Sequence, residues 1–203
     1  MSVVLYPLFV PTYGIALFCY AMSHRIAAMP IIWTVLVIMG TFLLTCVIPI
    51  SAIWLMVKAG KVSSMQIEDS SERTIPYIYS AVGFGCWAYL LIVILHTPTH
   101  IGLVAVGGTV AIGLVALINR VWKISAHLTG FGGLVGGWFS FCLGSGIIPT
   151  WGAVMTWFII TLSLMYARLY LQAHTSGQVI AGWLLGIVCT SLPYFCIVWV
   201  GIL

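Results

Sequence analysis

The sequence contains very little charge. Only 7 Lys or Arg and 3 Asp or Glu occur in 203 residues, so 5% of the chain is charged, against about 25% in a typical soluble domain. Hydrophobic residues make up 63%. So few charges cannot cover the surface of a soluble protein, and intrinsic disorder requires the opposite composition, low hydrophobicity with high charge. We therefore predict an integral membrane protein that crosses the bilayer several times.

Metal-binding and nucleic-acid-binding patterns are also missing. The net charge of +4 is small and scattered, so no basic stripe could follow a phosphate backbone. The 3 acids are too few for a Mg²⁺ site, and no Cys or His spacing fits a metal. We predict no nucleic-acid partner, no metal and no cofactor. We interpret the cysteines as small buried hydrophobic residues: Cys19, Cys46, Cys86, Cys142, Cys189 and Cys196.

Long apolar runs dominate what is present. A spanning helix needs about 20 apolar residues, and backbone groups in hydrocarbon must form hydrogen bonds within their own segment, which favours helices. We predict one domain, 1–203, with an all-α transmembrane bundle of six or seven spans, six if the Pro-bearing first run does not cross. The runs are 3–22, 30–57, 75–95, 101–118, 130–147, 151–167 and 178–201.

Glycines in the fifth run have the spacing of a helix-packing motif. Gly132 and Gly136, like Gly133 and Gly137, are four residues apart. Small residues at this spacing let the backbones of membrane helices approach closely. We favour this interpretation over a glycine-rich loop that cradles phosphate.

The connections between the runs divide the charges unequally. Connections alternate between the two membrane faces, and every charged residue except Arg25 falls on one face, which we call the charged side. A positive-inside count of Lys58, Lys61 and Arg120 against Arg25 places it in the cytoplasm. The charged side holds 58–74, 119–129 and 167–177, and the opposite side holds 23–29, 96–100 and 148–150.

Three segments on the charged side carry residues suited to phosphate chemistry. The first contains Arg73, the second runs from Lys123 through Ser125 to His127, and the third contains Arg168, His174 and Gln178. Guanidinium and ammonium groups bind phosphate oxygens. One neutral imidazole can attack phosphorus while another protonates the leaving oxygen.

In this order the segments resemble the type 2 phosphatidic acid phosphatase superfamily of membrane lipid phosphatases. That family has the pattern K-x6-R-P, then P-S-G-H, then S-R-x5-H-x3-D. Here Arg168 and His174 match with the family's spacing, but Ala167 and Gln178 replace Ser and Asp. In the second segment Ser125 and His127 match, without Pro or Gly. In the first, Arg73 precedes Thr74 rather than Pro, and Gln66 stands where Lys is expected.

The resemblance implies a role for each matching residue. His174 resembles the nucleophile that forms a phosphohistidine, and His127 resembles the general acid. Arg168, Arg73 and Ser125 resemble phosphate ligands, while Lys123 could replace the charge missing at position 66. We expect a metal-independent hydrolase that acts on a phosphate monoester or pyrophosphate of a membrane lipid or prenyl substrate. The resemblance also implies a multi-pass protein of a bacterial cell membrane, with its site outside the cytoplasm, so the facing of the site stays open.

Gln178, in place of the family's Asp, indicates an alternative function, the binding of phosphate without hydrolysis. An amide oxygen can accept the ring N–H of His174 and fix its tautomer, but it cannot supply the family's negative charge. In an unrelated triad the corresponding loss of charge costs about 10⁴ in rate. A protein that binds phospholipid or phosphate with weak or no turnover is therefore the second hypothesis. A transporter is less favoured, because transporters place polar sites near the bilayer midplane. The sequence does not indicate an oligomeric state.

Overall fold

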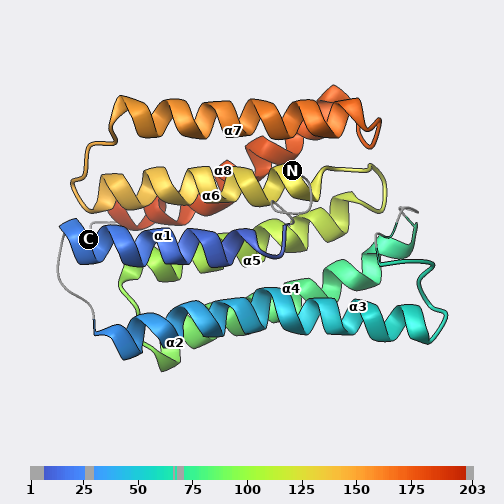
Figure 1. Cartoon of the computed structure of the whole chain (residues 1–203), viewed down its shortest axis with the longest axis horizontal. Helices are drawn as coiled ribbons and strands as arrows, with labels where there is room; N and C mark the ends of the chain where they lie inside the picture. The colour runs from blue at the N-terminus through green and yellow to red at the C-terminus, as the bar shows by residue number, and fades with distance from the viewer. Residues whose placement is uncertain (1–6, 26–29, 66, 68–70, 200–203) are drawn as a thin grey trace.

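The computed structural model is a bundle of helices, shown in Figure 1, and describes residues 7–25, 30–65, 67 and 71–199. No strand occurs in this part of the chain, which confirms the predicted all-α class. The helices are α1 (Val10–Arg25), α2 (Ile31–Phe42), α3 (Ile48–Lys58), α4 (Thr74–Tyr89), α5 (Thr99–Ile118), α6 (Ala126–Gly144), α7 (Trp151–Tyr170) and α8 (Ser176–Trp199).

Short stretches of other helix types extend or connect these elements. A π-helical turn, Leu43–Val47, joins α2 to α3 as one long helix. Pro49 follows this turn inside the long helix, where proline cannot donate a backbone hydrogen bond to the preceding turn. A second π-helical turn, Leu90–Ile94, extends α4, and a 3₁₀ turn, Ser71–Arg73, precedes it.

Several of the helices have the length and composition of membrane spans. Within the described residues, 5 helices are long and apolar enough to cross a bilayer: Ile31–Lys58, Thr74–Ile94, Thr99–Ile118, Trp151–Tyr170 and Ser176–Cys196. The helix α1 is shorter, with 16 residues, and the glycine-rich α6, with 19 residues, is not among these five. The helices are those of an integral membrane protein, as the composition predicts.

The charged side forms one end of the bundle. In Figure 1 the connections before α4, before α6 and between α7 and α8 all lie at the right-hand end. The connections between α4 and α5 and between α6 and α7 lie at the opposite end. Apart from α2 and α3, which form one long helix, consecutive helices run in opposite directions through short connections. Segments far apart in sequence therefore become neighbours at the charged end.

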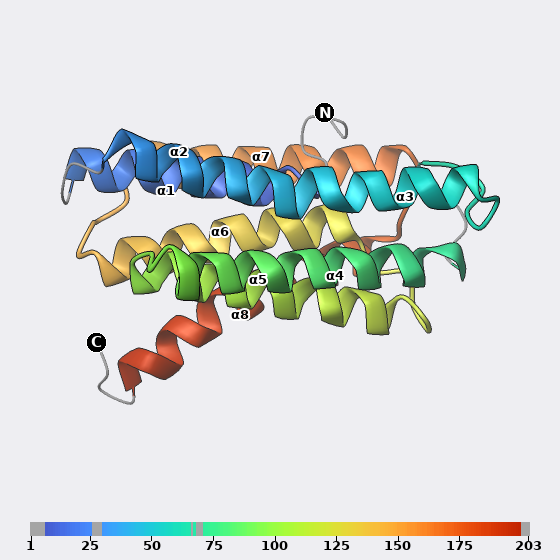
Figure 2. The same cartoon turned by 90° about the horizontal axis from the view of Figure 1, so that it is seen from below.

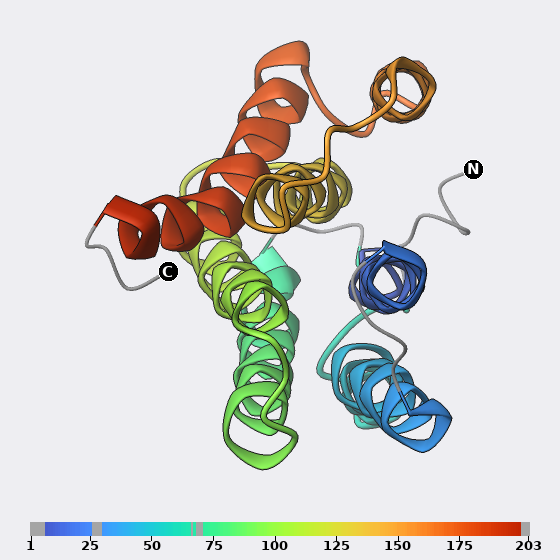
Figure 3. The same cartoon turned by 90° about the vertical axis from the view of Figure 1, so that its left-hand side faces the viewer.

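The helix α6 lies in the interior and contacts α1, α5, α7 and α8 (Figure 3). Its closest partner is α8, because glycines on both helices bring the backbones together. A Cβ atom added to Gly132 would overlap the carbonyl oxygen of Trp183, and one added to Gly136 would lie 2.7 Å from that of Ile187. On α8, a Cβ at Gly186 would overlap the carbonyl oxygen of Thr129. These contacts confirm the predicted packing role of Gly132 and Gly136.

The far end of α8 leaves the bundle (Figure 2). Pro193 lies inside this helix. Proline lacks the backbone N–H that would bond to the preceding turn, and its ring crowds that turn, so proline bends helices. The first half of α8, which packs on α6, is unaffected.

The prediction that all the cysteines are buried is wrong for two of them. Cys19, Cys46, Cys142 and Cys189 are buried, but Cys86 and Cys196 are exposed. Both exposed cysteines lie on helices that are apolar enough to span a membrane. A hydrophobic side chain there can face lipid tails, so hydrophobicity alone does not show which side of a membrane helix is covered by protein.

We predict that Gly132→Ala destabilises the fold by about 1–3 kcal/mol, because the added methyl group would overpack the contact between α6 and α8. The matched control is Gly113→Ala on α5, where an added Cβ meets no atom within 4 Å. Unfolding of both variants in detergent, followed by circular dichroism against denaturant, measures the difference. Equal stability of the two variants would contradict the close-packing role of Gly132.

Candidate phosphate-binding site

The three predicted segments meet at a cavity of about 110 Å³ at the charged end. The space is several times the about 10–15 Å³ that admits one water molecule, so it has room for a small polar group. Four of the seven predicted site residues line it: Arg73, His127, Arg168 and His174.

Each of these side chains is positioned by the end of a helix. Arg73 is the last residue of the turn before α4, and His127 is the second residue of α6. Arg168 lies in the last turn of α7, and His174 lies in the short connection to α8. Polar residues at helix ends avoid the hydrocarbon region, where a charge is costly. The antiparallel arrangement then gathers these ends at one place.

A strained loop holds Arg73. Its Nε donates a hydrogen bond of 2.8 Å to the carbonyl oxygen of Ile67. Ile67 is buried and has a φ of 47°, a left-handed conformation that is rare for a β-branched residue. Such strain persists only where surrounding structure imposes it, and it concentrates at functional sites. Here the unusual backbone turns a carbonyl group toward the Arg73 guanidinium.

The cavity brings two cationic side chains together. Arg73 and Arg168 are near enough for their like charges to repel each other. The Nε atom of Arg168 is buried and has no hydrogen-bond partner among the described residues. None of the described residues that line the cavity is Asp or Glu. Buried charge is costly unless it is paired, so the cavity is electrostatically suited to an anion.

The environment of His174 keeps its imidazole neutral. The residue is 9% exposed, and its pKa is lowered to about 4, first by burial and then by the charges of Arg168 and Lys123. Hydrogen bonds to the Lys123 carbonyl and to the Gln178 side chain oppose this shift. Because a carbonyl oxygen only accepts, the 3.2 Å contact to Lys123 places the proton on Nδ1. The lone pair of the neutral ring is then on Nε2.

Gln178 lies beside His174 and also caps α8. Its Oε1 accepts a hydrogen bond of 3.0 Å from the backbone N–H of Thr175, which satisfies one of the unpaired donors at the start of that helix. Its side chain also hydrogen-bonds the imidazole of His174. Gln178 therefore stabilises the start of α8 beside the ring, and its role in orienting the nucleophile stays a prediction.

Lys123 and Ser125 are near the cavity but are not among the residues that line it. Lys123 reaches His174 through its backbone carbonyl. Ser125 is completely buried beside α8, and its Oγ has no hydrogen-bond partner in the described part of the chain. Their roles as phosphate ligands stay predictions. Gln66, at the position where the resembling family has Lys, lies outside the described residues.

Two further polar residues of α4 line the cavity, and they were not predicted from the sequence. Tyr77 and Ser80 follow Arg73 by four and seven residues, a helical spacing that puts all three on one face. Ser80 donates its hydroxyl to the Pro76 carbonyl at 2.9 Å. Tyr77 is near enough to Arg168 for an electrostatic interaction. The spacing from Arg73 is the signal that could have identified Tyr77.

Among the described residues, no group of three or more His, Cys, Asp or Glu could hold a metal ion. Comparison of the chain with protein-family models, curated proteins and solved structures finds no match. The functional interpretation therefore rests on the geometry and electrostatics of the cavity.

We predict that His174 remains neutral well below the usual imidazole pKa of 6.5 and takes up its proton near pH 4. Burial and two positive neighbours disfavour the charged ring, so any reaction that needs the neutral ring loses rate as pH falls through about 4. Ring-¹⁵N NMR of labelled protein in detergent measures the titration, with His174→Gln to assign the resonance. Protonation at pH 6.5 or above would contradict the burial described here.

Proposed function

We propose that the chain is a membrane-embedded lipid phosphatase whose site is the cavity lined by Arg73, His127, Arg168 and His174. One observation supports this most strongly: two guanidinium groups and two imidazoles from four separate helix ends share one cavity whose described lining residues include no carboxylate. Guanidinium groups bind phosphate oxygens, and the neutral imidazole of His174 supplies a nucleophile beside them.

The proposed reaction uses the two histidines in turn. Nε2 of His174 attacks phosphorus, and the bond from phosphorus to the lipid oxygen breaks. His127 gives its proton to that leaving oxygen. Water then hydrolyses the phosphohistidine and releases phosphate. Arg73 and Arg168 stabilise the charge that develops on the phosphoryl oxygens, and the positive end of the α6 dipole lies beside them, because Ala126 and His127 line the cavity.

The position of the cavity supports a lipid substrate. It lies at one end of a bundle whose helices have the length and apolar composition of membrane spans. A phosphate monoester or pyrophosphate on a phospholipid or prenyl chain would present its headgroup there while its tail stays in the bilayer. In this proposal α6 crosses as well, giving six spans in a cell membrane, or seven if α1 also crosses.

We predict that His174→Ala lowers phosphate release by about 10³-fold or more, because the nucleophile is removed. The matched control is His24→Ala, which removes an exposed histidine of α1 that lies outside the cavity. Purified variants are assayed in detergent for phosphate release from phosphatidate and from a prenyl pyrophosphate. Equal release by wild type and His174→Ala would show that His174 is not the nucleophile.

Binding without turnover is the second candidate function, and Gln178 is the observation that favours it. Its amide hydrogen-bonds His174, but an amide carries no charge to stabilise the imidazolium that forms when the ring attacks. With its pKa lowered to about 4, His174 is also a weak base, which limits its nucleophilicity. The cavity would then retain phosphate binding while hydrolysis is slow or absent.

We predict that Gln178→Asp raises phosphate release by about tenfold or more, since a carboxylate beside the ring favours its protonated form; the loss of such a charge costs about 10⁴ in an unrelated triad. Gln172→Asp is the matched control, an exposed residue in the connection between α7 and α8. Phosphate release and phosphate binding are measured on both variants. If release stays at zero while binding persists, the protein binds phosphate without hydrolysing it.

A further inference from the structure

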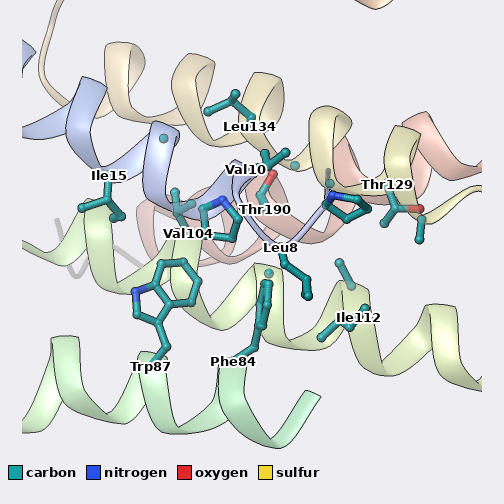
Figure 4. A pocket seen from close by; sticks show the side chains of 18 of the residues that line it. Leu8, Val10, Ile15, Phe84, Trp87, Val104, Ile112, Thr129, Leu134 and Thr190 are labelled. Atoms are coloured by element: carbon teal, nitrogen blue, oxygen red, sulfur yellow. The ribbon is translucent and has the colours of Figure 1, made fainter. Parts of the chain in front are cut away.

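A second cavity, of about 80 Å³, lies inside the bundle next to the candidate site (Figure 4). Helices α1, α4, α5, α6 and α8 contribute to its walls. Pro7, Leu8, Ile112 and Ala126 line both cavities. The two spaces are therefore separated by no more than a shared wall of small or apolar side chains.

The polar side chains that line the inner cavity already have hydrogen-bond partners within the protein. Thr129 and Thr190 line it, but their hydroxyls donate to the carbonyls of Ser125 and Gly186, each at 3.0 Å. Trp87 also lines it and donates its ring N–H to Thr41 at 2.9 Å. Cavities that lack polar partners stay dry and accept apolar molecules. The chemistry of the walls therefore selects hydrocarbon rather than water.

The inner cavity extends from the site toward the middle of the membrane. In Figure 4, Ile112 and Thr129 lie at one end of it, and Trp87 and Ile15 lie at the other. Along α6 its walls run from Ala126 to Leu134, which is about 12 Å at 1.5 Å per residue. This is less than half of the about 30 Å hydrocarbon thickness of a bilayer, so the depth suits a chain from one leaflet.

We infer that this cavity binds one hydrocarbon chain of the phosphate-bearing lipid, an inference that rests on the proposed function of the adjoining polar cavity. The phosphate lies among Arg73, Arg168 and the two histidines, and the chain passes Leu8 and Ile112 into the bundle. A second chain does not fit, because about 80 Å³ spread over a depth of about 12 Å is a narrow space with no room for two chains side by side. A phosphate on a single chain is therefore sufficient for recognition.

Two glycines of α5 provide a matched test of this inference. Gly108 lines the cavity, and a Cβ there would make ordinary contacts, 3.5 Å from Trp87 and 3.7 Å from Phe84. A leucine at this position would extend into the cavity. Gly113 is on the same helix, and a Cβ there meets nothing within 4 Å. Gly108→Leu fills the cavity, and Gly113→Leu adds the same side chain elsewhere.

The probes are butylphosphonate and dodecylphosphonate, whose carbon–phosphorus bonds are not hydrolysed, with affinity measured by calorimetry on protein in nanodiscs. We expect the wild type and Gly113→Leu to prefer the long chain equally, and Gly108→Leu to lose at least about tenfold of that preference. Gly108→Ala, which adds one methyl group, should lose less and keeps the test open if Gly108→Leu does not fold. An unchanged preference in both Gly108 variants would overturn the inference.

A dodecylphosphonate with a diazirine at the chain end gives a second readout. After irradiation, mass spectrometry should find the label on Phe18, Val104 or Leu134, which line the inner cavity. Label only on the outer faces of the helices would overturn the inference. If butylphosphonate still binds in that case, the proposed function is not affected. Failure of butylphosphonate and inorganic phosphate to bind at all would instead count against the proposed function, and with it against the chain site.

Discussion

The close contact between the backbones of α6 and α8 is the constraint on which the candidate site depends. Gly132 and Gly186 have no side chains to separate the helices, so the two backbones touch. The starts of both helices are then fixed against each other, and the N–H of Ser125 donates to the carbonyl of Gln178 at 3.3 Å. As a result the segment before α8 lies against the segment before α6, and His174 meets the carbonyl of Lys123.

The electrostatics of the site follow from this packing and from the membrane. Charged side chains are costly in hydrocarbon, so Arg73 and Arg168 occur at helix ends, and the antiparallel helices bring those ends together. The two guanidinium groups share a cavity whose described lining residues include no acid. The same positive surroundings, with burial, keep His174 neutral. The positive charge of the cavity and the neutral state of the His174 ring thus have one physical origin.

The two cavities differ in polarity in the same way as the two parts of an amphipathic lipid, its polar headgroup and its apolar chain. The polar cavity lies at the end of the bundle, where a headgroup would be, and the inner cavity extends among apolar residues toward the bilayer centre. Their shared wall includes Leu8 and Ile112. The glycines serve both features, because residues without side chains let α6 and α8 touch and leave space beside α5. Glycine therefore accounts both for the close contact between α6 and α8 and for the cavity beside α5.

The sequence by itself determined the membrane class, the helices and the end of the bundle at which the charges gather, because composition and run length are set by the bilayer. The spacing of Arg168 and His174 also pointed to the residues that line the cavity. Only the tertiary structure decided that Ser125 is buried beside α8, that the carbonyl of Lys123 contacts His174, and that Tyr77 lines the cavity. Hydropathy shows which segments can lie in the membrane. The direction of its side chain depends on the rotation of each helix about its axis, which is set by packing against its neighbours.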